Sequence, residues 1–77
     1  MKVVIVMSKV TKFGQKVRKV RTEKQMSQEQ LAYDAGLHRT YIGSVERAEK
    51  NLTIKNVFKI AEALDIDPGE LFNYDDL

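Results

Sequence analysis

Residues 27–47 read SQEQLAYDAGLHRTYIGSVER, two short amphipathic segments separated by a glycine. Ser27 is a preferred N-cap residue, and Gln30 three positions later completes the Ser-x-x-Gln pattern of a capping box. Gly36 predicts the end of the first segment, because the residue that follows a helix often needs a positive φ, which glycine adopts without a Cβ clash. The stretch therefore predicts two helices of about two turns each, joined by a turn so short that the helices cross at a steep angle.

The rest of the chain also has the apolar period of helices, and no run alternates in the manner of a β-strand. The stripe of the first helix recurs at spacings of three and four residues and consists of Val10, Phe13, Val17 and Val20. Lys16 is expected among the bases on the other faces of that helix. Thr53 and the pair Asp67-Pro68 have the residue types that begin helices. We therefore expect an all-α domain of five helices, at about 10–24, 28–35, 39–47, 54–64 and 68–72.

Length and composition limit the chain to one domain with little room for chemistry. Its 77 residues are too few for a separate sensing or catalytic domain, since domains have about 100 to 200 residues. There is no cysteine and His38 is the only histidine, so we expect no metal cluster and no cofactor. A lone histidine without a nucleophile or an orienting group also argues against an enzyme. The lack of cysteine fits a reducing, cytoplasmic environment.

Residues 1–8, MKVVIVMS, form a predicted leader or arm before a helical domain at residues 9–77. Their apolar core of about five residues is shorter than the roughly 7 to 15 of a signal peptide and the roughly 18 of a membrane span, so we expect no membrane association. Three interpretations stay open: a β-like arm that contacts a partner, a frayed leader, or a chain that starts at Met7.

The formal charge of +2 hides a strong asymmetry along the chain. All thirteen Lys and Arg residues precede Glu62 and are accompanied there by five acids, a net charge of +8, whereas the six acids from Glu62 onward give −6. A basic body fits a polyanion, and an acidic end fits a basic protein surface, such as a patch on RNA polymerase or a toxin. The alternative is a solvated charge pattern with no partner.

The second helix of the pair leaves one polar face uncovered. Ile42 and Val45 are predicted to point inward, and the other side then carries the small or hydrogen-bonding residues Arg39, Thr40, Gly43, Ser44 and Arg47. An α-helix fits the major groove of DNA, where the planar fork of an arginine bonds guanine O6 and N7 together. We therefore predict Arg39, Thr40, Gly43 and Ser44 as base-reading residues and Arg47 as a phosphate contact.

The stretch Met26–Phe72 resembles the lambda-repressor-like helix-turn-helix family, often called the XRE family. The matching positions are Gln28, Leu31-Ala32, Gly36, Ile42, Val45-Glu46 and Glu70-Leu71-Phe72. Within that family, Arg39-Thr40-Tyr41-Ile42, Glu46-Arg47 and Asn51-Leu52-Thr53 resemble the controller proteins of restriction-modification systems. The resemblance implies a transcription regulator of such a system that binds double-stranded DNA. Phage-type repressors and antitoxins share much of the pattern and stay open as alternatives.

Further roles follow from the resemblance, position by position. Contacts to the DNA backbone are expected at Gln28, His38, Tyr41, Arg47, Lys50 and Asn51. The positive end of a helix favours anions, which supports Gln28, whereas His38 has the alternative role of an N-cap and Tyr41 that of a half-buried packing residue. The resemblance also implies a partly buried ion pair between Arg21 and Glu46 that joins the first helix to the recognition helix.

One recognition helix contacts too few base pairs to find a single site in a genome. We therefore expect a homodimer that binds a palindromic operator with half-sites about 34 Å apart. The dimer face should be apolar and away from the basic surface, and the C-terminal third offers Phe58, Ile66 and Phe72 for it. The alternative is that these side chains close the core of the monomer.

Overall fold

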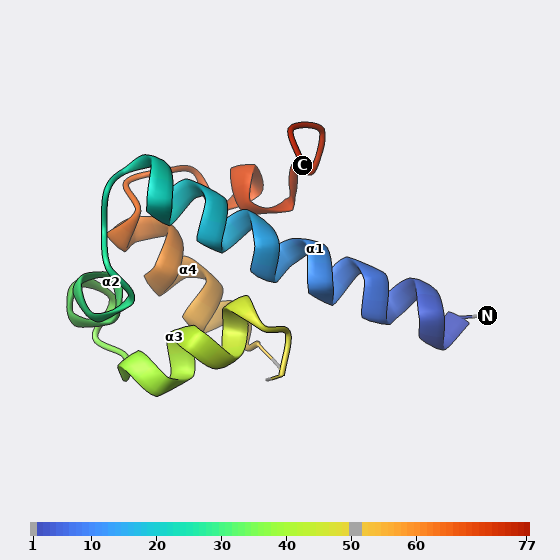
Figure 1. Ribbon diagram of the computed structural model, residues 1–77, viewed down its shortest axis with the longest axis horizontal. Helices are drawn as coiled ribbons and strands as arrows, with labels where there is room; N and C mark the ends of the chain where they lie inside the picture. Colours follow the sequence, from blue (N-terminus) through green and yellow to red (C-terminus); the bar gives the residue numbers. More distant parts are fainter. Residues whose placement is uncertain (1, 50–51) are drawn as a thin grey trace.

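Four α-helices and one 3₁₀ segment make up the described part of the chain, in a computed structural model that covers residues 2–49 and 52–77 and the side chains from Lys9 onward (Figure 1). The elements are α1 (Lys2–Glu23), α2 (Gln28–Ala35), α3 (Arg39–Glu46), α4 (Ile54–Ala63) and η1 (Pro68–Phe72). No β-strand occurs within these ranges, so the all-α class is confirmed.

The predicted fifth α-helix is wrong, because Pro68–Phe72 winds as a 3₁₀ helix. Its start is as predicted: the Asp67 carboxylate accepts a hydrogen bond from Gly69 N at 2.8 Å, and proline follows the cap. The segment has only five residues, too short for a stable α-helical ladder, and the tighter 3₁₀ turn is the usual form of such pieces. Leu71, which is fully buried, anchors it to the core.

Helix α1 begins at Lys2, not at the predicted Val10, and its N-terminal turns extend beyond the other helices (Figure 1). A β-like arm is therefore wrong for residues 2–8, whose backbone is helical. The division into a leader and a domain at residue 8 stays a prediction, since one helix runs through it. None of the described helices combines the length and the apolar content needed to cross a bilayer.

The predicted apolar stripes meet in a single core between α1, the α2–α3 pair and α4. The buried cluster comprises Phe13, Val17, Val20, Leu31, Ala32, Ile42, Val45, Val57, Ile60, Ala61, Leu64 and Leu71. Burial of one large aliphatic side chain contributes about 1.5–3 kcal/mol, so this cluster supplies most of the force that holds α2 and α3 in place. Val10 lies half-buried at the edge of the core.

Each α-helix is followed by a residue with positive φ. Gly36 has the predicted left-handed conformation, with φ of 67°, and three residues with a Cβ adopt it as well: Gln25 at 59°, Ala48 at 59° and Asp65 at 56°. In each case the next N–H bonds back five residues: Met26 to Arg21, Leu37 to Ala32, Glu49 to Ser44 and Ile66 to Ala61, at 2.8–3.1 Å. These bonds satisfy carbonyls that the end of a helix otherwise leaves unpaired.

Gly14 allows α1 to approach the end of α3. A Cβ at this position would lie 2.5 Å from the carbonyl oxygen of Val45 and 2.8 Å from that of Glu46, distances that no side chain tolerates. The last turn of α3 is therefore packed directly against the backbone of α1.

The expected ion pair between Arg21 and Glu46 is present at this contact and is nearly buried. Arg21 Nε lies 2.6 Å from Glu46 Oε2 and Nη2 lies 3.0 Å from Oε1, with side chains 11% and 4% exposed. Arg21 Nη1 also donates to the carbonyl of Met26 at 2.8 Å, and Gln28 Nε2 donates to Glu46 Oε1 at 3.1 Å. One carboxylate therefore joins α1, α2 and α3.

We expect Glu46→Ala to lower the free energy of unfolding by about 3–5 kcal/mol, because it leaves the guanidinium of Arg21 without its counter-charge in a nearly buried position. Glu49→Ala is the control: it removes the exposed partner of Arg47 and should cost less than about 1 kcal/mol. Urea unfolding followed by circular dichroism measures both. Equal losses in the two variants would contradict the role assigned to Glu46.

Lys16 departs from the predicted pattern of α1, since it lies inward and only 1% of the residue is exposed. Its Nζ lies 3.2 Å from Glu70 Oε1 and 2.8 Å from Asp76 Oδ1, and Lys19 Nζ lies 3.4 Å from the other oxygen of Asp76. The hydrogen bond between Lys16 and Asp76 raises the pKa of the lysine and lowers the pKa of the aspartate. Two of the six C-terminal acids are thus neutralised within the chain.

The lowered pKa of Asp76 predicts an acid-sensitive contribution to stability. The contribution is complete above the ordinary aspartate pKa of about 4 and is lost as the pH falls from there through the lowered pKa of the folded protein. Melting temperatures of the wild type and Asp76→Asn should therefore differ near neutral pH and converge in acid. Asp75→Asn, which removes the neighbouring charge outside this cluster, should show no convergence. A gap between the wild type and Asp76→Asn that does not vary with pH would refute the expectation.

Candidate nucleic-acid interface

The turn between α2 and α3 presents the first residues of α3 to solvent. Ser27 caps α2 as predicted, with its hydroxyl accepting from Gln30 N at 3.0 Å, but the Gln30 amide bonds Asp34 at 2.8 Å, so only half of the capping box forms. After Gly36, the N–H of Leu37 bonds the Ala32 carbonyl at 2.8 Å. The side chain of Leu37 packs against the core, which turns the chain sharply into α3 (Figure 1).

The predicted base-reading residues Arg39 and Thr40, which we call the reading end of α3, are both exposed. The Arg39 side chain is 65% exposed, and its Nε lies 3.6 Å from Glu29 Oε1 on α2. Ile42 and Val45 bury the opposite side of α3, as predicted. The helix is therefore held by its inner face while its first turn stays accessible, the orientation that lets a helix enter the major groove.

The predicted base-reading roles of Gly43 and Ser44 assumed that both residues lie on an exposed face of α3. That assumption is wrong, because both are buried. Ser44 is only 5% exposed, and its hydroxyl donates to the carbonyl of Thr40 at 2.9 Å. Serine commonly folds back onto its own helix in this way, which removes the hydroxyl from other partners. Gly43 is also buried, and a Cβ there would lie 3.1 Å from Nη1 of Arg47, so that side chain lies over it.

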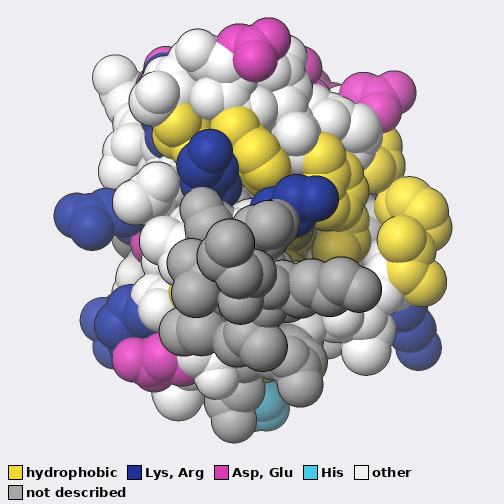
Figure 2. Space-filling model, turned by 90° about the vertical axis from the view of Figure 1, so that its right-hand side faces the viewer, with side chains coloured by type: hydrophobic (Ala, Val, Ile, Leu, Met, Phe, Trp, Pro, Cys, Tyr) yellow, Lys and Arg dark blue, Asp and Glu magenta, His cyan; other side chains and the backbone are white. Residues whose placement is uncertain are grey.

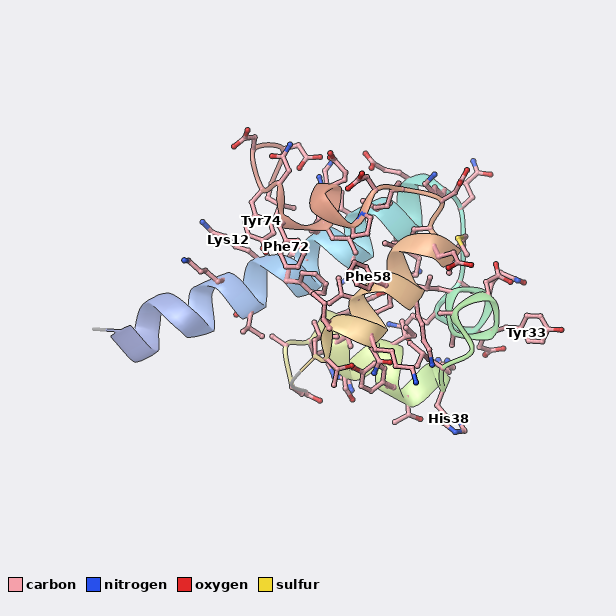
Figure 3. The ribbon with its side chains drawn as sticks, turned by 180° about the vertical axis from the view of Figure 1, so that it is seen from behind. Lys12, Tyr33, His38, Phe58, Phe72 and Tyr74 are labelled. Atoms are coloured by element: carbon pink, nitrogen blue, oxygen red, sulfur yellow. The ribbon has the colours of Figure 1, made fainter. Side chains whose placement is uncertain are left out.

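The predicted backbone contacts on α2 and the turn differ in accessibility. Gln28 is half-buried, and its amide is already oriented by the bond to Glu46. One N–H of that amide remains for another acceptor. His38 is exposed and points away from the body of the molecule (Figure 3). It is the N-cap of α3 by position, but its side chain makes no capping hydrogen bond.

Tyr41 and Arg47 flank the same surface. Tyr41 is half-buried, and its hydroxyl oxygen accepts a hydrogen bond from Asn56 Nδ2 at 3.0 Å. Arg47 is exposed, and its Nε donates to Glu49 Oε2 at 3.1 Å, a bond that raises the pKa of the guanidinium. The predicted contacts Lys50 and Asn51 lie outside the described residues.

Two polar residues at this surface escaped the sequence analysis, Glu29 and Asn56. Glu29 adjoins Gln28 in the first turn of α2, and only the crossing of the two helices brings it to Arg39, ten positions away. Asn56 follows the Thr53 cap by three residues, and its bond to Tyr41 spans fifteen positions. The sequence gives no signal for Asn56, because its half-buried position is apparent only in the folded structure.

A separate apolar surface lies between α1, the start of α4 and the C-terminal segment. Its groove of about 750 Å³ is lined by Lys9, Val10, Phe13, Leu52, Ile54, Val57, Phe72 and Tyr74. Figure 2 shows hydrophobic side chains gathered on one side of the molecule, next to basic ones. Phe72 is 52% exposed, with its ring centroid 5.2 Å from that of Phe13, and it lies close to Tyr74 (Figure 3).

The three predicted dimer residues are not equivalent. Phe58 on α4 is 52% exposed, as is Phe72, whereas Ile66 is half-buried and packs against the core. Ile54, four residues before Phe58 and therefore on the same face of α4, is 67% exposed. Large exposed apolar side chains in one area indicate a surface for another protein.

Comparison with known proteins agrees with this geometry. A family model described as helix-turn-helix matches residues 17–71. Control protein C.BamHI of Bacillus amyloliquefaciens is 48% identical to this chain over 63 residues, which cover 80% of the chain and 78% of that protein.

Two solved structures resemble the chain throughout most of its length. The restriction-modification controller protein C.AhdI from Aeromonas hydrophila has a TM-score of 0.83 and 51% identity, and the match covers 84% of this chain and 98% of that one. The controller protein C.Esp1396I, solved as a tetramer with its natural 35 base-pair operator, has a TM-score of 0.77 and 41% identity, covering 82% of this chain and 83% of its own. The chain therefore belongs to the XRE-type helix-turn-helix family, together with the control proteins of restriction-modification systems.

Proposed function

We propose that this protein is a sequence-specific transcription regulator that binds a palindromic DNA operator as a homodimer and controls the expression of a restriction-modification system. The observation that carries the proposal is the exposed reading end of α3, Arg39 and Thr40, on a helix whose other side is fixed in the core. The family is one of DNA-binding regulators, not an enzyme class.

Base recognition is assigned to the reading end of α3. The terminal nitrogens of Arg39 match the two acceptors of a guanine edge, and Thr40 offers a hydroxyl and a methyl group to the next base. Gln28 on α2, His38 before α3, Tyr41 in α3 and Arg47 at the end of α3 are assigned contacts to phosphates, which fix the position of the protein but carry no sequence information. Lys50 and Asn51 are kept as predicted phosphate contacts from their place after α3 in the sequence.

The dimer is assigned to the apolar surface around α4 and η1. Phe58 and Phe72 are its central residues, and Ile54 extends it along α4. Ile66 is kept as a predicted contributor at the edge, where it supports the surface from the core side. A palindrome requires two reading ends related by a two-fold axis, and we place that axis at this surface.

Control of restriction-modification genes is favoured over the alternatives. Control protein C.BamHI and the restriction-modification controller protein C.AhdI match this chain over most of their own lengths. An antitoxin or a phage-type repressor is not favoured by these matches. Contact with RNA polymerase stays a prediction, and Glu70 and Asp76 of the acidic end are already engaged by Lys16.

Arg39→Ala tests the base-reading role. We expect it to cost about 1–3 kcal/mol of binding free energy on the preferred duplex and to relax the choice at one base pair, because a bidentate contact to guanine is lost. Arg47→Ala is the matched control on the same helix: loss of a phosphate contact should weaken all sequences alike and reduce the salt dependence. Fluorescence anisotropy with preferred and random duplexes separates the two. The assignment fails if Arg39→Ala changes neither affinity nor base choice.

Phe58→Asp tests the dimer surface. A charge placed in the centre of an apolar interface should weaken self-association by at least about tenfold, since central aromatic residues carry much of the binding energy of such contacts. Tyr33→Asp is the control, because Tyr33 is 83% exposed on α2 and projects from the molecule elsewhere (Figure 3). Sedimentation velocity over a concentration series measures both dissociation constants. Unchanged self-association in Phe58→Asp would exclude this face.

A further inference from the structure

Glu29 is an acidic residue in the middle of a surface to which the proposed function assigns DNA binding. Its side chain is 76% exposed, and it lies in the first turn of α2 beside Gln28, a predicted phosphate contact. A carboxylate facing a duplex is repelled by phosphates, so its presence lowers affinity for DNA of any sequence. A compensating role for Glu29 lies either in the fold or in recognition.

The contact of Glu29 with Arg39 has a specific geometry. The carboxylate oxygen Oε1 lies 3.6 Å from Nε, the guanidinium nitrogen on the stem side of the fork. Within the described residues, no acceptor bonds the two terminal nitrogens of Arg39, which remain available. A bidentate contact to guanine O6 and N7 needs two nitrogens of the fork in one plane, and Nη1 and Nη2 meet that need.

The contact between Glu29 and Arg39 contributes little to the stability of the fold. Both side chains are largely exposed, at 65% and 76%, and 3.6 Å is longer than a hydrogen bond. Exposed ion pairs of this kind contribute little to stability. Favourable interaction of Glu29 with the positive end of α2 is a second small effect, which any acid in the first turn would provide.

We propose that Glu29 is a positioning residue, which holds Arg39 by its Nε so that the terminal nitrogens of the guanidinium are directed at guanine. The inference rests on the proposed function and deepens it. A guanidinium held in one orientation loses less conformational freedom on binding its base. The same carboxylate repels phosphates near the reading end. Glu29 therefore lowers the affinity for DNA of any sequence and increases the discrimination between sequences.

The test uses duplexes selected from a random library by the wild-type protein. Dissociation constants are measured by fluorescence anisotropy for the selected duplex, for each of its single base-pair substitutions and for a random duplex. The variants are Glu29→Gln, Arg39→Ala and the double variant. Asp34→Asn is the matched control, because Asp34 is an exposed acid on the same helix that bonds Gln30 and takes no part in the pair with Arg39.

Arg39→Ala identifies the base pair that Arg39 reads. We expect Glu29→Gln to reduce discrimination at that base pair by about three- to tenfold, as for coupled neighbouring residues, and at no other position. Its affinity for the random duplex should rise, as it should for Asp34→Asn, because each variant removes one negative charge. Asp34→Asn should leave discrimination unchanged, and Glu29→Gln should add no further loss of discrimination to Arg39→Ala.

Unchanged discrimination in Glu29→Gln would overturn the positioning role, as would a further loss in the Arg39→Ala background or an equal loss in Asp34→Asn. Failure of the proposed function has a different signature: the library yields no preferred sequence, or Arg39→Ala alters no base preference. In that case both the positioning role and the proposed function are rejected. Thermal melting of each variant verifies that the compared proteins are folded.

Discussion

The carboxylate of Glu46 joins the three helices on which the orientation of the proposed DNA-binding surface depends. It accepts hydrogen bonds from Arg21 on α1 and from Gln28 on α2, while Gly14 lets the backbone of α1 meet the end of α3. Moving two charges out of water is costly, and a buried pair adds little net stability over an apolar contact of the same shape. The pair contributes to the orientation of the helices, because its hydrogen bonds fix the angle between them, whereas an apolar contact would let one helix slide along the other. No buried side-chain polar atom of the described residues lacks a partner, so the network is complete.

The helix pair was predictable from local signals that agree with the tertiary packing. The cap at Ser27, the left-handed Gly36 and the inward Ile42 each follow from residue type and spacing, and each is observed. Features that depend on competition between distant groups were not predictable. Lys16 lies three residues after Phe13, at the edge of the apolar stripe, but its charge predicts an exposed side chain. It is buried because two carboxylates from the C-terminal end reach its Nζ. The 3₁₀ winding of the short segment η1 was also not predicted, because its cap and proline signal the start of a helix but not its type.

The candidate site shows the same division. Exposure of Arg39 and burial of Val45 follow from the period of the helix. The helical period predicts only which way a side chain points, however. The hydroxyl of Ser44 donates to the carbonyl four residues earlier and is therefore not available to another partner. The contact of Glu29 with Arg39 depends on the crossing angle of two helices. Pairs at a helix crossing cannot be found from a motif alone, yet they decide how a proposed reading residue such as Arg39 is held.

Three of the four α-helices in the described part of the chain are followed by a residue whose Cβ makes the left-handed conformation unfavourable: Gln25, Ala48 and Asp65. Each such stop costs about 1–2 kcal/mol relative to the right-handed conformation, a large amount beside the few kcal/mol that hold a small domain folded. None of the three belongs to the reading end of α3. This chain therefore has room for stabilising substitutions at positions outside the reading end, and a more stable scaffold tolerates destabilising substitutions at other positions.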